Sequence, residues 1–136
     1  MIEKTFIIFK PDSVQRQLTG EIINRFEKVG LKVVGMKMVK VDNNFAKKHY
    51  SELIKKPFYK YLEKYITESP VIAMVLEGIN AVELVRKMVG HTEPKQSLPG
   101  TIRGDYAHHS YEYADEKGIS IKNLIHASGN KEEAEK

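Results

Sequence analysis

Cysteine and tryptophan are both missing from this chain of 136 residues. The lack of cysteine excludes disulfide bonds, catalysis by a thiolate and cysteine-ligated zinc. Long apolar runs are missing too, since none approaches the roughly 18 residues that a membrane-spanning helix needs. The first apolar stretch, 5–9, is too short for a signal peptide and lacks a small-residue cleavage site, so we expect a cytoplasmic protein without a membrane span.

Several motifs of nucleotide- and RNA-binding proteins are also absent. The chain has no Walker A loop, no GxGxxG turn, no HRD or DFG motif and no aromatic run like RNP1. Its composition, 41% apolar and 29% charged, predicts a single globular domain over 1–136. Residues 1–65 carry 14 Lys and Arg against 7 Asp and Glu. This basic half is either a binding surface for nucleic acid or nucleotide phosphates, or a solvated lysine-rich surface.

Apolar periodicity and turn residues predict alternating strands and helices. We expect helices over 22–29 and 80–90, a helical insertion in two pieces over 43–68, and strands over 6–9, 31–41, 71–76 and 119–125. Gly30 and Gly90 are helix stops, Asn80 with Glu83 forms a capping box, and Asp12 caps a short helical turn. Without the insertion, the order β-α-β-β-α-β is that of a ferredoxin-like α+β sandwich, a four-stranded antiparallel sheet with helices packed on it.

Finer features follow from particular residues. Gly35 and the pair 38–39 indicate twist or a bulge in the second strand. Pro57 divides the helical insertion, and its second piece carries an apolar stripe that includes Phe58 and Leu62. Residues 130–136 begin with capping-box spacing and predict the start of a last helix.

The segment 90–105 follows neither the strand period nor the helix period, and long irregular loops in compact domains are usually functional. Thr92 and Arg103 lie in this loop and Arg86 lies just before it, which supplies a hydroxyl and two guanidinium groups suited to phosphate oxygens. Taken singly, each arginine more often has a structural role, at a helix C-terminus or in a surface ion pair. A phosphate site in this chain would be built from these three side chains and Lys10.

One of the five histidines, His126, lies at the end of an apolar strand and before two small residues. A buried sheet would hold its imidazole rigidly, and a neutral imidazole has a nucleophilic nitrogen. A lone histidine in such a place is still more often structural. His108 and His109 are adjacent, so an extended chain would point them in opposite directions, and no third metal ligand has suitable spacing.

Three segments stand in the order and setting of one known family: KPD at 10–12, PGTIRGD at 99–105 and NLIHAS at 123–128. With 20–23 and 56–58, they make the chain similar to the nucleoside diphosphate kinases over essentially its whole length. The resemblance implies a ferredoxin-like fold and ping-pong transfer of the γ-phosphoryl group of a nucleoside triphosphate to a nucleoside diphosphate. It also implies Mg²⁺ carried by the nucleotide phosphates rather than by protein ligands, and a homo-hexamer or a tetramer.

The resemblance also assigns roles to residues. His126 matches the nucleophile that becomes phosphohistidine at its pros nitrogen, and Ser128 matches a supporting residue. The other matches are phosphate contacts from Lys10, Arg86, Thr92 and Arg103, sugar contacts from Asn123 and Lys10, base contacts from Phe58 and Leu62, and Tyr50 beside the nucleophile.

The chain departs from the family pattern in several places. The link over 106–122 is longer than usual, which leaves the second wall of the base slot unassigned. Gly129 replaces an acidic residue, and the chain ends at Lys136, before the glutamate that hydrogen-bonds the histidine, so we expect a C-terminally truncated form. Strand alternation places Asn123 and His126 on opposite faces, so both line one site only if the strand bends. A nucleic-acid-binding or regulatory nucleotide-binding module of the same topology, without turnover, is the alternative function.

Overall fold

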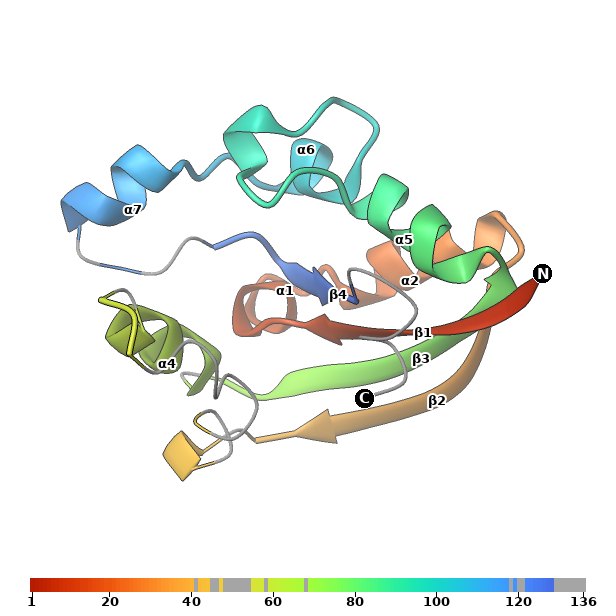
Figure 1. Cartoon of the computed structure of the whole chain (residues 1–136), viewed down its shortest axis with the longest axis horizontal. Helices are drawn as coiled ribbons and strands as arrows, with labels where there is room; N and C mark the ends of the chain where they lie inside the picture. The colour runs from red at the N-terminus through yellow and green to blue at the C-terminus, as the bar shows by residue number, and fades with distance from the viewer. Residues whose placement is uncertain are drawn as a thin grey trace.

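The protein, as a computed structural model, is described over residues 1–40, 42–44, 47, 55–57, 59–67, 69–117, 119 and 122–128. A four-stranded antiparallel sheet of order β2-β3-β1-β4 forms its centre (Figure 1). The strands are β1 (Ile2–Phe9), β2 (Lys32–Val39), β3 (Val71–Ile79) and β4 (Ile125–Ala127). The apolar run in β1 suits its interior place in the sheet, where both faces are covered. The predicted ferredoxin-like arrangement is confirmed.

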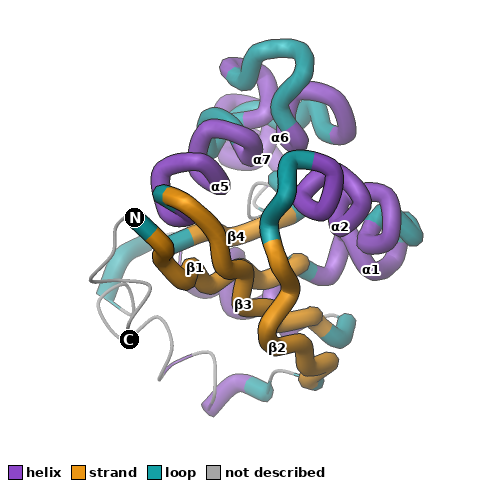
Figure 2. The backbone as a smooth tube through the Cα atoms, turned by 90° about the vertical axis from the view of Figure 1, so that its right-hand side faces the viewer, coloured by secondary structure: helices purple, strands orange, loops and turns teal. Residues whose placement is uncertain are grey.

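Helices α2 (Thr19–Lys28) and α5 (Ala81–Val89) cover one face of the sheet (Figures 1 and 2). Their fully buried Phe26 and Val85 pack with Phe9 of β1 in the main core. Burial of one such side chain contributes about 1.5–3 kcal/mol, so this layer is a large part of the stability of the fold.

The helix of the insertion, α4 (Tyr59–Thr67), reaches the other face of the sheet. Its Ile66 packs with Ile8 of β1 and Val71 of β3 in a second core cluster. Directly opposed residues of paired strands project from the same face, and His126 of β4 lies opposite Ile8. The fold therefore places the candidate nucleophile on the face of the sheet that α4 contacts.

Four further helices, all short, have described bounds. Helix α1 (Pro11–Gln15) follows β1 directly, and the segment before β4 holds η2 (Pro94–Gln96), α6 (Ile102–Tyr106) and α7 (Tyr111–Lys117). The prediction that 90–105 is irregular is wrong where it overlaps η2 and α6, because a single helical turn is too short to produce a recognisable period.

Other boundaries need correction as well. Asn80 precedes α5 as predicted but has φ +50°, and its side chain caps nothing; Glu3 Oε1 instead accepts from the N–H of Val82 (3.4 Å). Asp12 lies inside the first turn of α1, and Lys10 takes the N-cap position. The predicted irregularity at Gly35 is confirmed by a register shift, whereas the pairing with β3 is regular at 38–39.

Some predictions fall on residues outside the described chain, namely most of the first piece of the insertion and the last helix at 130–136. Among the residues that the structure does describe, no helix is long and apolar enough to cross a membrane.

Candidate functional site

The site is organised around a left-handed residue, Leu124, immediately before β4. Its φ is +72°, which interrupts the alternation that would otherwise separate Asn123 from His126. The last strand therefore begins at Ile125, and the predicted strand over 119–125 is wrong. The bend that sequence reasoning required between Asn123 and His126 is present at this residue.

The end of β1 and helix α1 hold the peptide groups of Leu124. Its carbonyl oxygen accepts from the N–H of Lys10 and from Ser13 Oγ, each at 2.8 Å. Its N–H donates to Asp12 Oδ2 at 3.1 Å. The Lys-Pro-Asp segment thus anchors the turn that leads into the histidine strand.

Arg103 of α6 holds the same turn from another side. Its guanidinium is buried and donates to three backbone carbonyls, through Nε to Asn123 (3.2 Å), Nη1 to Gly90 (3.1 Å) and Nη2 to Ile125 (2.5 Å). Burial, followed by the nearby charge of Arg86, lowers the pKa of Arg103 to about 10. The group remains charged at neutral pH and, like any guanidinium, has five N–H donors.

Lys10 and Asn123 lie beside this arginine. Lys10 Nζ donates to Asn123 Oδ1 at 2.9 Å, and Asn123 Nδ2 donates to the carbonyl of Thr92 at 2.8 Å. Burial first, and then the charge of Arg103, lower the pKa of Lys10 to about 8, although Asp12 acts in the opposite direction. Two buried cations side by side favour the approach of an anion, because an anion relieves both their repulsion and their desolvation.

The remaining predicted residues lie around this centre. Arg86 is exposed on α5 and donates through Nη1 to the carbonyl of Ala127 at 3.3 Å, next to His126. His126 is half-buried in β4, Thr92 is exposed, and Leu62 is buried on α4. Ser128 bonds to the Phe6 carbonyl through both N–H and Oγ, which ties the end of β4 to β1. Tyr50 and Phe58 lie outside the described residues.

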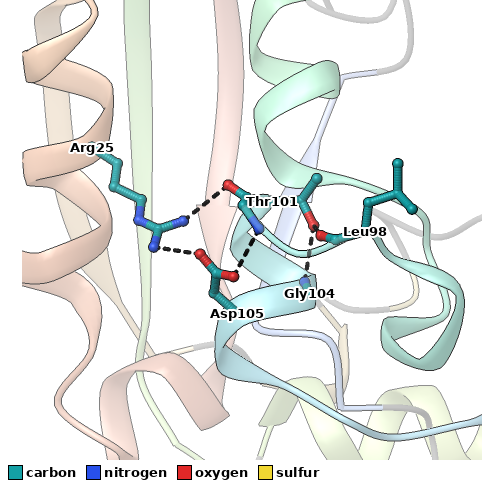
Figure 3. Close-up of polar contacts among 6 residues, drawn as sticks. Arg25, Leu98, Thr101, Gly104 and Asp105 are labelled. Atoms are coloured by element: carbon teal, nitrogen blue, oxygen red, sulfur yellow. Dashed lines mark hydrogen bonds and ion pairs between the residues drawn. The ribbon is translucent and has the colours of Figure 1, made fainter.

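The Pro-Gly-Thr-Ile-Arg-Gly-Asp segment fixes the position of α6 and hence of Arg103. Asp105 accepts from Arg25 of α2 (2.6 Å) and from the N–H of Gly100 (2.8 Å), while Thr101 Oγ1 accepts from the N–H of Gly104 (3.0 Å) (Figure 3). A Cβ on Gly104 would lie only 2.1 Å from the carbonyl oxygen of Leu98, so only glycine fits there.

The long link between α6 and β4 is fastened to the loop that carries Thr92. The N–H of Tyr111 donates to Glu93 Oε2 (2.7 Å), and the N–H of Lys95 donates to the carbonyl of His109 (3.0 Å). His109 Nδ1 accepts from the N–H of Lys122 (3.4 Å), and burial lowers the pKa of this histidine, which favours the neutral, accepting form.

The donor set of the site suits phosphate rather than a protein-bound metal. Lys10, Arg86 and Arg103 are cationic, and the nearest carboxylate, Asp12, is buried and engaged by Tyr65 and Leu124. Within the described ranges, no group of three or more His, Asp or Glu residues could hold a metal ion. Cationic side chains of this kind bind phosphate oxygens rather than a metal ion.

Sequence reasoning missed the residues that support the site. It did not predict the bonds of Asp12 and Ser13 to Leu124, or the bond of the Tyr65 hydroxyl to Asp12. The only local signal was a carboxylate and a hydroxyl directly after a buried strand and a proline.

The chain is similar to one protein family over nearly its whole length. Residues 3–136 match the family model described as nucleoside diphosphate kinase. A nucleoside diphosphate kinase from Pyrococcus horikoshii is 57% identical over 134 residues, which are 98% of this chain and 81% of the relative. The nucleoside-diphosphate kinase from Borrelia burgdorferi, solved as a transition-state mimic with vanadate and ADP, superposes with a TM-score of 0.93 at 48% identity, covering 98% of this chain and 83% of that one.

A halophilic nucleoside diphosphate kinase from Halobacterium salinarum, solved in complex with CDP, superposes with a TM-score of 0.82 at 44% identity. It covers 94% of this chain and 78% of that one. Because the family model matches nearly the full length of this chain, the chain belongs to the nucleoside diphosphate kinase family.

Proposed function

We propose that this protein transfers the γ-phosphoryl group of a nucleoside triphosphate to a nucleoside diphosphate, through a phosphohistidine at His126. The family membership supports the reaction. The observation that carries the residue assignment is that one turn, at Leu124, joins the buried cations Lys10 and Arg103 to the strand that bears His126. A nucleophile beside fixed positive charge is what transfer of a charged phosphoryl group requires.

The chemistry divides into two equivalent halves. In the first, the pros nitrogen (Nδ1) of His126 attacks the γ-phosphorus in line, the bond to the β-γ bridging oxygen breaks, and the nucleoside diphosphate leaves with that electron pair. In the second, a terminal β-phosphate oxygen of another diphosphate attacks the phosphohistidine and regenerates the imidazole. One pocket therefore serves donor and acceptor in turn, which predicts ping-pong kinetics.

The remaining roles are those that the resemblance to the family implies. Lys10, Arg86, Arg103 and Thr92 bind the phosphates, and Lys10 also binds the sugar together with Asn123. Ser128 supports the nucleophile strand through its bonds to Phe6. Mg²⁺ borne by the nucleotide neutralises phosphate charge when it is bound. Tyr50 beside the nucleophile and Phe58 at the base remain predictions, because both lie outside the described residues.

Broad base tolerance is part of the proposal. Leu62, and Phe58 with it, offers the base an apolar surface without hydrogen-bonding selectivity, and aromatic stacking accepts every base. Relatives of this chain have been solved with ADP and with CDP, a purine and a pyrimidine nucleotide. The homo-hexamer or tetramer and the cytoplasmic location stay predictions.

Brief exposure to ATP labelled at the γ-phosphate tests the function. We expect label on the protein that is acid-labile, stable to alkali and removed by GDP. His126→Ala should abolish both labelling and transfer, whereas the control His108→Ala, at an exposed histidine, should keep both. Label on Ser128 or His109, or label that GDP does not remove, would contradict the assignment.

A further inference from the structure

A buried carboxylate, Asp12, has no role in the reaction proposed above. It lies in the first turn of α1, only 4% exposed, two residues after Lys10, a proposed phosphate ligand. Both of its oxygens are used, because Oδ1 accepts from the hydroxyl of Tyr65 and Oδ2 accepts from the N–H of Leu124. A charged group is costly to bury, and this one is compensated by contacts with two distant parts of the chain.

The contact between Asp12 and Leu124 acts on a strained residue. A left-handed conformation costs roughly 1–2 kcal/mol for a residue with a Cβ, and the apolar side chain of Leu124 cannot offset that cost with a local hydrogen bond. Such a residue keeps its conformation only when its surroundings hold it. The carboxylate of Asp12 is the acceptor for its N–H.

The conformation of Leu124 sets the position of His126. Among the described residues, strand β4 pairs with β1 through three residue pairs, and the opposition of His126 to Ile8 is the middle one. Relaxation of Leu124 to a negative φ would turn the chain that enters this short strand. The imidazole would then move relative to Arg103, which bonds to the residues on either side of Leu124.

The contact between Asp12 and Tyr65 reaches helix α4, which carries the proposed base contact Leu62. Tyr65 is 3% exposed on α4, three residues after Leu62 and hence on the same helix face. Burial, and then the carboxylate of Asp12, raise the pKa of Tyr65 well above its usual value, so its hydroxyl stays protonated and donates. The carboxylate is thus bonded both to the helix that carries a proposed base contact and to the turn that leads to the nucleophile.

We propose that Asp12 is a positioning residue for His126, which fixes the left-handed turn at Leu124 and, through Tyr65, joins that turn to helix α4. This proposal rests on the proposed function. It differs from a general structural role because it predicts a loss in the phosphoryl-transfer step that exceeds any loss in nucleotide binding.

The experiment uses the full chain and the isosteric variant Asp12→Asn. We expect the rate constant for phosphorylation of His126 by ATP to fall about 10–100-fold, the usual effect of removing an orienting partner. The affinity for MgADP, measured by calorimetry, should change less than about threefold, and the ring resonances of His126 in NMR spectra should shift. Tyr65→Phe, which removes one hydroxyl, should act in the same direction with a smaller loss.

The matched control is Tyr59→Phe, on the same helix, because the hydroxyl of Tyr59 interacts with Glu63 of its own helix rather than with Asp12. It should phosphorylate at the wild-type rate. A wild-type rate in Asp12→Asn, or equal losses of binding and rate, overturns the proposal. If Asp12→Asn does not fold, a wild-type rate in folded Tyr65→Phe overturns it. If the wild-type protein itself acquires no label at His126, the proposed function has failed.

Discussion

Lys10 illustrates how a residue acquires its chemistry from distant contacts. Sequence reasoning predicted it as a phosphate ligand, and the structure places its amine 2.9 Å from Asn123 Oδ1, 113 residues away. Its lowered pKa comes from burial and from Arg103, neither of which the sequence around position 10 indicates. The residue types and their order therefore predicted which side chains belong to the candidate site. The protonation state of Lys10 could not be predicted, because it depends on the folded environment.

The lowered pKa of Lys10 predicts proton uptake when nucleotide binds. Because that pKa is about 8, roughly half of the Lys10 amines are neutral at about pH 8 in the free protein. A bound polyphosphate favours the charged form, so MgADP binding at this pH should take up to roughly half a proton per site. Calorimetric titration in two buffers with different ionisation enthalpies measures this uptake. Lys10→Arg stays charged at every relevant pH and should lose the uptake; unchanged uptake in that variant would assign the proton to another group.

Asp12 marks the limit of prediction at this scale. Its sequence position indicated a helix cap, but its partners Tyr65 and Leu124 lie 53 and 112 residues away. No local pattern encodes contacts of that separation.

At the scale of elements, the longer strands and helices were predicted, and of the short ones only the helical turn at Asp12 was. The segments that became β1 and β3 carry continuous apolar runs, and those that became α2 and α5 carry apolar helix periods that end at Gly30 and Gly90. The histidine strand, in contrast, was predicted over 119–125 but runs over Ile125–Ala127. Its apolar residues resemble a longer strand, and only the bonds of Leu124 to α1 explain the interruption. Helix α6 was likewise predicted as part of a loop, because tertiary contacts rather than a local pattern define it.

Glycine 104 provides a test of how α6 is held. In Gly104→Ala the new Cβ would lie 2.1 Å from the Leu98 carbonyl oxygen and 2.7 Å from Thr101 Oγ1. Relieving this overlap requires α6 to shift, which should cost about 1–3 kcal/mol of unfolding free energy and displace Arg103, lowering turnover. Urea denaturation and the rate of phosphoryl transfer measure the two effects.

The matched control for that variant is Gly20→Ala in α2, where a Cβ meets nothing within 4 Å. Alanine is the better helix former, so this change should leave turnover unaltered and raise the stability by up to about 1 kcal/mol. Equal effects of the two substitutions would mean that the close approach at Gly104 does not hold α6 in place.

At the scale of the whole molecule, the site draws on nearly every part of the chain. Lys10 follows β1, Leu62 lies on α4, Arg86 on α5, Arg103 on α6 and His126 on β4. Composition left three interpretations of the basic half open: a surface for nucleic acid, a surface for nucleotide phosphates, or a solvated lysine-rich surface. The arrangement of these elements favours a compact phosphate, because the buried cations Lys10 and Arg103 converge on one turn rather than along a surface.

This convergence predicts that nucleotide binding stabilises the native state, since the unfolded chain cannot assemble the site. MgADP at about a hundred times its dissociation constant should add about 2.7 kcal/mol to the free energy of unfolding. For a domain of this size that corresponds to a rise in Tm of roughly 5–10 °C, measurable by calorimetry. Adenosine, which lacks the phosphates, should give a much smaller shift at equal concentration, because Lys10, Arg86 and Arg103 then have no anion to bind.

A short single-stranded RNA is the decisive comparison. Stabilisation by RNA equal to that by MgADP, with a steep dependence on salt, would indicate a nucleic-acid-binding surface instead.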